Sequence, residues 1–156
     1  MRRKQAPVLT INSLFCCYRL RIRRSPIHRF GVFATEQIPG GRKVMEYTGQ
    51  LMSSRALIQR AGEKSQVKCR KLICLARLDD YWVLDGASGG SGAEFISHSC
   101  DPNLKLRWLA GHLLFFSRRA IRKGQELTAD YRFSNKTEPV SCHCGSPNCR
   151  GTINVH

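Results

Sequence analysis

The feature that most constrains this chain is a cluster of three cysteines near the end of the sequence. Residues 141–152 read SCHCGSPNCRGT, so Cys142, Cys144 and Cys149 follow a CxCx4C pattern. A structural zinc ion takes four ligands in a tetrahedron, and cysteine thiolates are common ligands in such sites. This segment supplies only three thiolates. The pattern therefore predicts that a fourth ligand from elsewhere in the chain ties the segment to the rest of the fold.

The cysteine spacing alone leaves the fourth ligand open. A zinc ribbon that binds nucleic acid could draw on Cys69 and Cys74, but their C-x4-C spacing is looser than usual for such ribbons. Both cysteines also lie in or beside the apolar run 71–76, which is typical of a buried strand. The remaining cysteines stand at positions 16, 17 and 100.

The eight cysteines can also be interpreted as disulfide-forming residues of an exported protein. The chain begins MRRKQAPVLTI, and neither a long apolar core nor a small-residue cleavage site follows, so we expect no secretory signal. No run approaches the roughly 18 apolar residues of a membrane helix, so we expect no membrane segment. These observations favour reduced thiolates in an intracellular protein.

The chain is strongly basic, with 26 Lys and Arg against 11 Asp and Glu, a formal net charge of +15. Residues 1–24 contain seven of these cations and no acid. Such a surface favours anionic partners such as nucleic acid, acidic protein faces or membrane headgroups, although it can also simply keep the protein soluble. The length of 156 residues and the hydrophobic content of 42% suit one globular domain.

Short apolar runs alternate with turn residues, which predicts a β-rich domain. One stretch, SRALIQRA, is expected to be a helix with Ser53 as its N-cap and Gly62 at its end. Residues 86–95, GASGGSGAEF, interrupt the strands with glycines, which is typical of a sharp turn or of a close approach to a ligand. Strands are expected over residues 7–11, 18–22, 31–34, 43–48, 71–76, 81–85, 104–109 and 112–117.

Four separated stretches contain residue types suited to chemistry. Taken singly, each has a plain explanation as a strand or a turn. His98 beside Cys100 resembles a Cys–His nucleophilic pair, but such pairs are usually assembled from distant segments. The order of the four stretches along the chain, with the cysteine cluster after them, is more informative than any one stretch. The stretches are HRFGVFA (28–34), EYTGQL (46–51), GAEFISHSCDPN (92–103) and GQELTADY (124–131).

Three motifs, ISHSCDPN, ELTADY and CHCGSPNCRG, resemble the NHSCxPN, ELTxDY and post-SET signatures of SET-domain protein lysine methyltransferases. The resemblance covers roughly residues 25–154 and includes no pre-SET cysteine cluster. It implies a mainly β SET fold of small curled sheets with short helices and a C-terminal pseudoknot, a threaded arrangement that is otherwise rare. It also implies the boundaries of a basic N-terminal segment (1–24), a SET domain (25–133), a linker (134–141) and a post-SET zinc-binding tail (142–156).

In this family the fourth zinc ligand is the cysteine of the NHSC signature. The resemblance therefore assigns one structural zinc ion to Cys100 together with Cys142, Cys144 and Cys149. Zinc binding of this kind contributes on the order of 10 kcal/mol or more at neutral pH, which is enough to order a short segment with little core of its own. The ion would also hold this segment over His98, where the cofactor S-adenosyl-L-methionine is expected.

The 28–34 stretch looks like the family's GxG segment, whose backbone approaches the cofactor. Gly31 matches the second glycine, whereas Arg29 stands in place of the first. We expect the backbone of Phe30 to keep its contact with the cofactor, provided that Arg29 does not need a positive φ.

Further cofactor contacts are implied by the signature itself. His98 matches the histidine that faces the adenine, and Ser97 replaces the usual asparagine with a shorter, single polar group. Ile153 is expected to cover the adenine as an apolar lid. Ser91 and Glu94 stand where the family often has Asn and Arg, so Glu94 reverses a charge that we expect beside the cofactor.

Tyr131, the last residue of ELTADY, matches the family's catalytic tyrosine, and Tyr47 matches a second tyrosine at the lysine channel. Methyl transfer to an amine needs an uncharged, in-line nitrogen, but the pKa of a free lysine is about 10.4. An apolar channel beside a positive sulfonium lowers that pKa by desolvation and like-charge repulsion. Tyrosine hydroxyls then position the amine without adding a charge.

The resemblance thus implies S-adenosylmethionine-dependent methylation of a lysine in a protein, with a histone tail as the expected acceptor. The alternative is a catalytically weak or inactive SET-fold module that binds nucleic acid or chromatin through its basic surface. The first interpretation places the protein in the nucleus of a eukaryote, or, for a bacterium, in the cytoplasm or in a host cell to which it is delivered.

Overall fold

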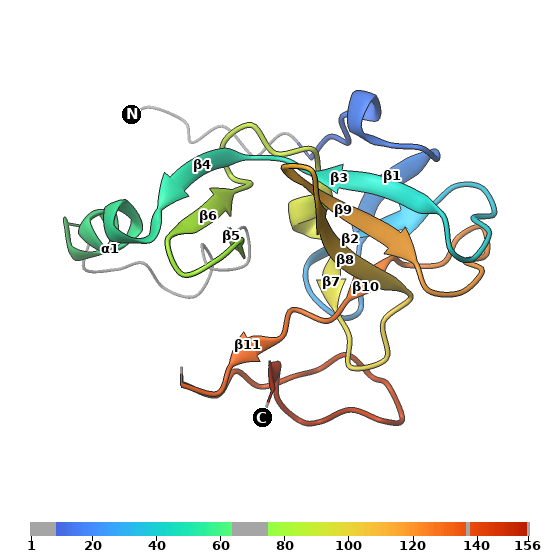
Figure 1. Cartoon of the computed structure of the whole chain (residues 1–156). Coiled ribbons are helices and arrows are strands. Elements are labelled where there is room, and N and C mark those ends of the chain that lie inside the picture. Colours follow the sequence, from blue (N-terminus) through green and yellow to red (C-terminus); the bar gives the residue numbers. More distant parts are fainter. Residues whose placement is uncertain (1–8, 64–74, 137, 156) are drawn as a thin grey trace, which may run out of the picture.

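The computed structural model describes residues 9–63, 75–136 and 138–155. Within these residues, short strands gather in small separate sheets with one α-helix at the side, so the mainly β prediction is confirmed (Figure 1). The strands are β1 (Leu20–Arg24), β2 (Phe30–Ala34), β3 (Lys43–Tyr47), β4 (Gln50–Ser53), β5 (Leu75–Arg77), β6 (Trp82–Asp85), β7 (Ser97–His98), β8 (Leu104–Leu109), β9 (His112–Ser117), β10 (Thr128–Ala129), β11 (Phe133–Ser134) and β12 (Asn154–Val155).

Six of the expected strands are present and begin within two residues of the predicted starts, as β1, β2, β3, β6, β8 and β9. The expected strand 7–11 is wrong over its described part, because residues 9–11 pair with no strand and run into a hydrogen bond from Asn12 N to Ser91 O at 2.9 Å. The expected strand 71–76 falls partly outside the described residues, and only its end is seen, in β5.

The predicted helix is α1 (Ser54–Glu63), which ends one residue beyond the expected Gly62. The Ser53 hydroxyl accepts a hydrogen bond from Ala56 N at 3.1 Å, so the predicted N-cap is confirmed. Two 3-10 helices, η1 (Ser13–Phe15) and η3 (Ala93–Phe95), complete the helical elements of the described residues. No helix in this part of the chain is long and apolar enough to cross a membrane.

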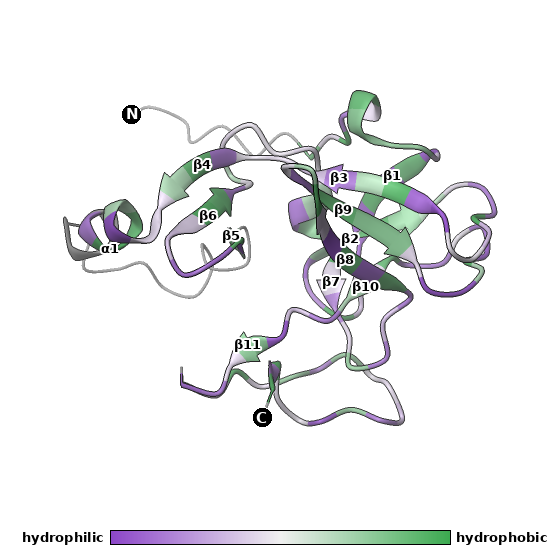
Figure 2. Ribbon diagram, viewed as in Figure 1, coloured by the Kyte–Doolittle hydropathy of each residue, from purple (hydrophilic) through white to green (hydrophobic). Residues whose placement is uncertain are grey.

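The core lies between the β1–β2 hairpin and the three-stranded sheet β3–β9–β8. Both pairs in that sheet are antiparallel, and Tyr47 at the end of β3 lies opposite Leu113 of β9. Alternation in β2 points Val32 and Ala34 inward, where both are fully buried. Figure 2 shows hydrophobic colouring along β9 and part of β2. The sheet thereby fixes the position of Tyr47.

Two segments about thirty residues apart lie side by side through the parallel pairing of β7 with β10. The buried side chain of Asn103 joins them further: its Oδ1 accepts from Thr128 N at 2.9 Å, and its Nδ2 donates to Glu126 O at 2.7 Å. The C-terminal tail folds back in the same region, because β12 pairs in parallel with β11. These pairings bring the NHSC-like loop, the ELTADY segment and the tail together.

The turn between β1 and β2 contains Arg29 with a φ of 24°. This is the positive-φ region that favours glycine. The predicted contact of Phe30 with the cofactor required that Arg29 not need a positive φ. This requirement is not met, because Arg29 takes a positive φ, which strains an arginine backbone. The turn nevertheless keeps its place, since all five residues of β2 pair with β1.

We predict that Asn103→Ala lowers the free energy of unfolding by about 3 kcal/mol, because two buried backbone groups lose their partners. Urea unfolding followed by circular dichroism measures this loss. Asn135→Ala, at an exposed position, is the matched control and should change stability little. An Asn103→Ala protein as stable as the control would contradict the role given to this side chain.

Arg29→Gly should stabilise the fold. Strain of roughly 1–3 kcal/mol is relieved, and about 0.4–1 kcal/mol is lost to the greater freedom of glycine in the unfolded chain. We therefore expect a net gain of about 1 kcal/mol in the same unfolding experiment. Arg24→Gly, within β1, should do the opposite, and a loss of stability in Arg29→Gly would show that the turn is not strained.

Candidate metal and cofactor site

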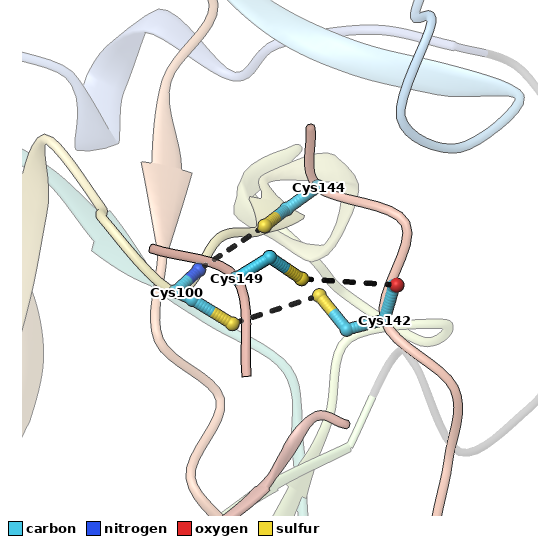
Figure 3. A group of neighbouring side chains, drawn as sticks. All are labelled: Cys100, Cys142, Cys144 and Cys149. Carbon is cyan, nitrogen blue, oxygen red and sulfur yellow. Dashed lines mark hydrogen bonds between the residues drawn. The ribbon is translucent and has the colours of Figure 1, made fainter. Parts of the chain in front are cut away.

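The sulfur atoms of Cys100, Cys142, Cys144 and Cys149 all lie within 4.8 Å of one another, as Figure 3 shows. Cys100 follows β7, and the other three come from the tail. The Cys100 and Cys142 sulfurs are 3.7 Å apart. That is far beyond the roughly 2.05 Å of a disulfide bond and close to the about 3.8 Å between sulfurs of a tetrahedron with Zn–S bonds of 2.3 Å. The donor set fits a tetrahedral thiolate-bound ion.

The backbone around the cluster points N–H groups at the sulfurs. Arg150 N donates to Cys100 Sγ at 3.4 Å, and Gly151 N donates to Cys149 Sγ at 3.4 Å. Cys100 N donates to Cys144 Sγ at 3.5 Å. Burial by itself raises the pKa of the Cys144 thiol, but hydrogen bonds from the backbone N–H groups of Cys100 and Ser146 and from the thiols of Cys142 and Cys149 outweigh it and lower the pKa to about 6. Donors of this kind stabilise thiolates and orient them as ligands.

Of the other cysteines, the two that the structure describes do not join the cluster. Cys16 and Cys17 lie beside η1, and burial raises the pKa of Cys16 to about 11. Cys69 and Cys74, the possible ribbon ligands, lie outside the described residues. Of the candidates for a fourth ligand that the structure describes, only Cys100 meets the three tail cysteines.

His98 lies between the sulfur cluster and the ELTADY segment. Its side chain is buried, and Tyr131 N donates to its Nδ1 at 3.1 Å. Nδ1 must therefore be unprotonated, and burial lowers the pKa of His98, which favours the neutral ring. The single proton is then on Nε2, which lies 3.5 Å from Cys100 Sγ. One imidazole thus bonds to a cluster sulfur on one side and to the Tyr131 backbone on the other.

Both candidate tyrosines contact residues 86–96, that is, the glycine-rich stretch 86–95 or Ile96 directly after it. The Tyr131 hydroxyl donates to Ile96 O at 2.5 Å, and its ring meets His98 edge-on with the centroids 5.4 Å apart. The Tyr47 hydroxyl lies over Gly86, where an added Cβ would be 2.7 Å away. The stretch that interrupts the strand pattern therefore forms a floor that both hydroxyls touch.

Glu126 is a site residue that no sequence signal singled out, although it begins ELTADY. It accepts a hydrogen bond from the Ser97 hydroxyl at 2.7 Å. A Cβ at Gly31 would overlap the same carboxylate, so only glycine allows this approach. The structure thus brings together Gly31 and Ser97, which sequence reasoning assigned to the cofactor, with Glu126 between them.

Glu94, expected to place a negative charge beside the cofactor, turns its carboxylate into its own loop. Oε2 accepts from Gly92 N at 2.9 Å, and an added Cβ at Gly90 would lie 2.6 Å from both oxygens. Burial raises the pKa of this carboxyl. Ser91 is also buried and donates to Glu46 O at 2.6 Å. Both departures from the family pattern therefore have partners within the fold.

An ion pair joins the tail to the ELTADY segment. The Arg150 guanidinium donates to both carboxylate oxygens of Asp130 at 2.9 Å. Although burial acts in the opposite direction, this contact and the N–H of Arg132 hold the pKa of Asp130 below its ordinary value. Arg150 also donates to Ile153 O at 3.4 Å, so the expected lid residue is attached to the same pair. The sequence signal that could have identified this ion pair is the arginine directly after the last cysteine.

Comparison with known proteins supports one family. The SET domain family matches residues 29–132. The chain is 38% identical over 144 residues to a histone H3-lysine(4) N-trimethyltransferase, ATX1, of Arabidopsis thaliana, covering 87% of this chain and 13% of that protein. It is 38% identical over 136 residues to the histone-lysine N-methyltransferase trithorax of Drosophila virilis, covering 84% of this chain and 4% of that protein.

A third relative is the histone-lysine N-methyltransferase set-2 of Caenorhabditis elegans, 36% identical over 142 residues, with 86% of this chain and 9% of that protein covered. The chain thus spans only a small part of these relatives. The family match includes β2, both tyrosines, His98 and Cys100, and the mainly β architecture agrees with it. This chain belongs to the SET-domain family.

Proposed function

We propose that this chain methylates the ε-amino group of a lysine in a protein, with S-adenosylmethionine as the methyl donor. The observation that carries the proposal is the position of His98, bonded at once to a cluster sulfur and to the backbone of Tyr131. The relatives' names support a histone as the acceptor and chromatin, in a eukaryotic nucleus, as the place of action. Each residue's part follows from its contacts.

The four thiolates would hold one zinc ion. Bound there, zinc supplies a cross-link between the loop after β7 and the tail, and no chemistry of its own. The tail also meets the ELTADY segment through the pair Arg150–Asp130, so it has a second attachment near Tyr131. This pair is partly exposed, so it orients the tail more than it stabilises the fold. The role given to this end of the chain is to close a wall of the cofactor site.

Gly31, His98 and Ile153 would hold the methyl donor, which supplies an electrophilic methyl group on a sulfonium, and Ser97 would act through Glu126. The Phe30 contact is not proposed, because it depended on Arg29 not needing a positive φ. The fit rests on Gly31, where the missing side chain leaves the backbone open beside Glu126. The Glu126 carboxylate favours a cationic group nearby. Ser97 is engaged with that carboxylate, so its hydroxyl orients Glu126 rather than the ligand directly. The backbone path through residues 28–34 places Arg29 in a strained, positive-φ conformation.

Tyr131 and Tyr47 would position the acceptor amine. Because the Tyr131 hydroxyl proton is directed at Ile96 O, its oxygen acts as a hydrogen-bond acceptor toward any other group. An acceptor stabilises an amine N–H and turns the nitrogen lone pair toward the methyl group. This orientation makes Tyr131 a positioning group for the nitrogen. Tyr47, held by β3 over Gly86, lies at the other side of the glycine-rich floor.

The alternative function is a non-catalytic module that binds nucleic acid or chromatin. The net charge of +15 and the replacements Arg29 and Ser97 favour it. Calorimetry with S-adenosylmethionine separates the two functions. Binding supports the enzyme, and its absence at millimolar ligand would leave only the module.

Tyr131→Phe should lower turnover on histone peptides by about 100-fold, because the amine loses the acceptor that aligns it. Cofactor affinity should stay within about twofold, since the backbone bond to His98 remains. Mass spectrometry of the peptide and calorimetry measure the two quantities. Tyr81→Phe, at a largely exposed tyrosine, is the control and should react as the wild type does. Normal turnover in Tyr131→Phe would overturn the assignment.

The purified chain should contain one equivalent of zinc, measured by plasma mass spectrometry. Cys100→Ser should reduce that content and expose residues 134–155 to proteolysis, because the cross-link to the tail is removed. Cofactor affinity should fall with it. Cys17→Ser, at an exposed thiol away from the cluster, should retain the metal. Full zinc content in Cys100→Ser would remove this residue from the ligand set.

A further inference from the structure

Two loops far apart in sequence form a single basic surface at one end of the sheet β3–β9–β8. Residues 39–43 read PGGRK and residues 117–124 read SRRAIRKG, and neither stretch contains an acid. Both loops lie at the right of Figure 1, where β9 ends and β3 begins. We call this surface the basic end. Its exposed cations are Arg42, Lys43, Arg118, Arg119, Arg122 and Lys123.

The two loops are locked together by Ser117, which is fully buried. Its hydroxyl donates to Pro39 O at 2.6 Å, and Arg42 N donates to the hydroxyl at 2.9 Å. The backbones pair as well, with Ser117 N donating to Arg42 O at 2.8 Å. Ile38 and Ile121 exchange both of their backbone hydrogen bonds, at 2.9 and 2.8 Å. The cations are therefore mounted on one preorganised backbone, which lowers the entropy cost of binding a partner.

Most of this charge is not neutralised within the fold. Arg119 pairs with Asp101 at 3.1 Å. Among the described residues, no acid lies within ion-pair distance of Arg42 or Lys43, nor of the cations at 122 and 123. The surface extends across the sheet, because Lys43, Phe116 and Lys105 stand opposite one another in register. A compact excess of positive charge remains.

We propose that the basic end binds the phosphate backbone of double-stranded DNA. Four of its six cations are arginines, whose planar guanidinium groups match phosphate oxygens in pairs. Large exposed apolar side chains are absent from both loops, which are fully described. A membrane site needs such side chains to insert, and a protein interface needs them for its core. A rigid surface with charge alone suits a polyanion of regular shape.

The basic end also lies in a suitable position for the proposed methylation of a protein lysine. This point rests on that proposed function. β3 runs from Lys43 at the basic end to Tyr47 at the proposed lysine channel. Five residues of strand span about 13 Å between their first and last Cα atoms. DNA bound at the first end would therefore lie about one strand's length from the proposed lysine channel.

Fluorescence anisotropy of a 30-base-pair duplex with the full chain, without methyl donor, tests the proposal between 50 and 200 mM salt. The variant Arg42→Ala/Lys43→Ala/Arg122→Ala/Lys123→Ala should bind at least about tenfold more weakly at 100 mM salt. Its plot of log affinity against log salt should be shallower by about 0.9 for each phosphate that the variant no longer neutralises, or about 3.6 for the four cations. The circular dichroism spectrum and urea unfolding of this variant should match those of the wild type, which separates the effect of charge from a failure to fold.

The matched control removes four exposed cations elsewhere, in the variant Arg21→Ala/Arg23→Ala/Arg55→Ala/Arg107→Ala. It should keep a slope close to that of the wild type. Equal losses of affinity in both variants would show that DNA responds only to net charge, and would overturn the proposal. So would a wild-type affinity for a polyglutamate peptide equal to that for the duplex. Because no turnover is measured, failure here leaves the methylation proposal standing, and failure of methylation leaves this one standing.

Discussion

The loop 97–103 and the segment 126–131 lie against each other because a short parallel pairing and one buried amide join their backbones. Asn103 satisfies groups on both sides of the contact, and β7 and β10 continue it. Four residues of the candidate site lie on these two stretches. Cys100 and His98 come from the first, and Glu126 and Tyr131 from the second. Separating them would scatter the sulfur cluster, the histidine and the tyrosine together.

His98 makes this contact directional. A neutral ring with its proton on Nε2 can serve Cys100 only while Nδ1 accepts from Tyr131 N, so each bond specifies the tautomer that the other requires. Desolvation maintains this arrangement by disfavouring a second proton. The metal-binding sulfurs and the aromatic ring of Tyr131 therefore share one rigid intermediary, in the way that outer-shell partners orient ligands in metal sites.

The sequence predicted the parts of the fold that local chemistry dictates. Alternating apolar residues indicated β3, β8 and β9, the Ser53 cap indicated α1, and motif order pointed to Cys100 as the fourth thiolate. The backbone of Arg29 could not be predicted, since its φ is imposed by the pairing of β1 with β2. No local sequence pattern indicated that the Glu94 carboxylate would bond within its own loop. The contact between Glu126 and Gly31 depends on where two distant backbones cross, which spacing does not encode.

The salt link between Arg150 and Asp130 has a consequence for how the chain gains and loses its ion. The Arg150 guanidinium lies on the same tail as three of the thiolates, but its hydrogen bonds to Asp130 do not require a metal ion. Without the ion, this bond would still hold one point of the tail near the aspartate, although the rest of the tail is loosened. The loop that zinc must close on rebinding is then shorter, so less loop entropy is lost.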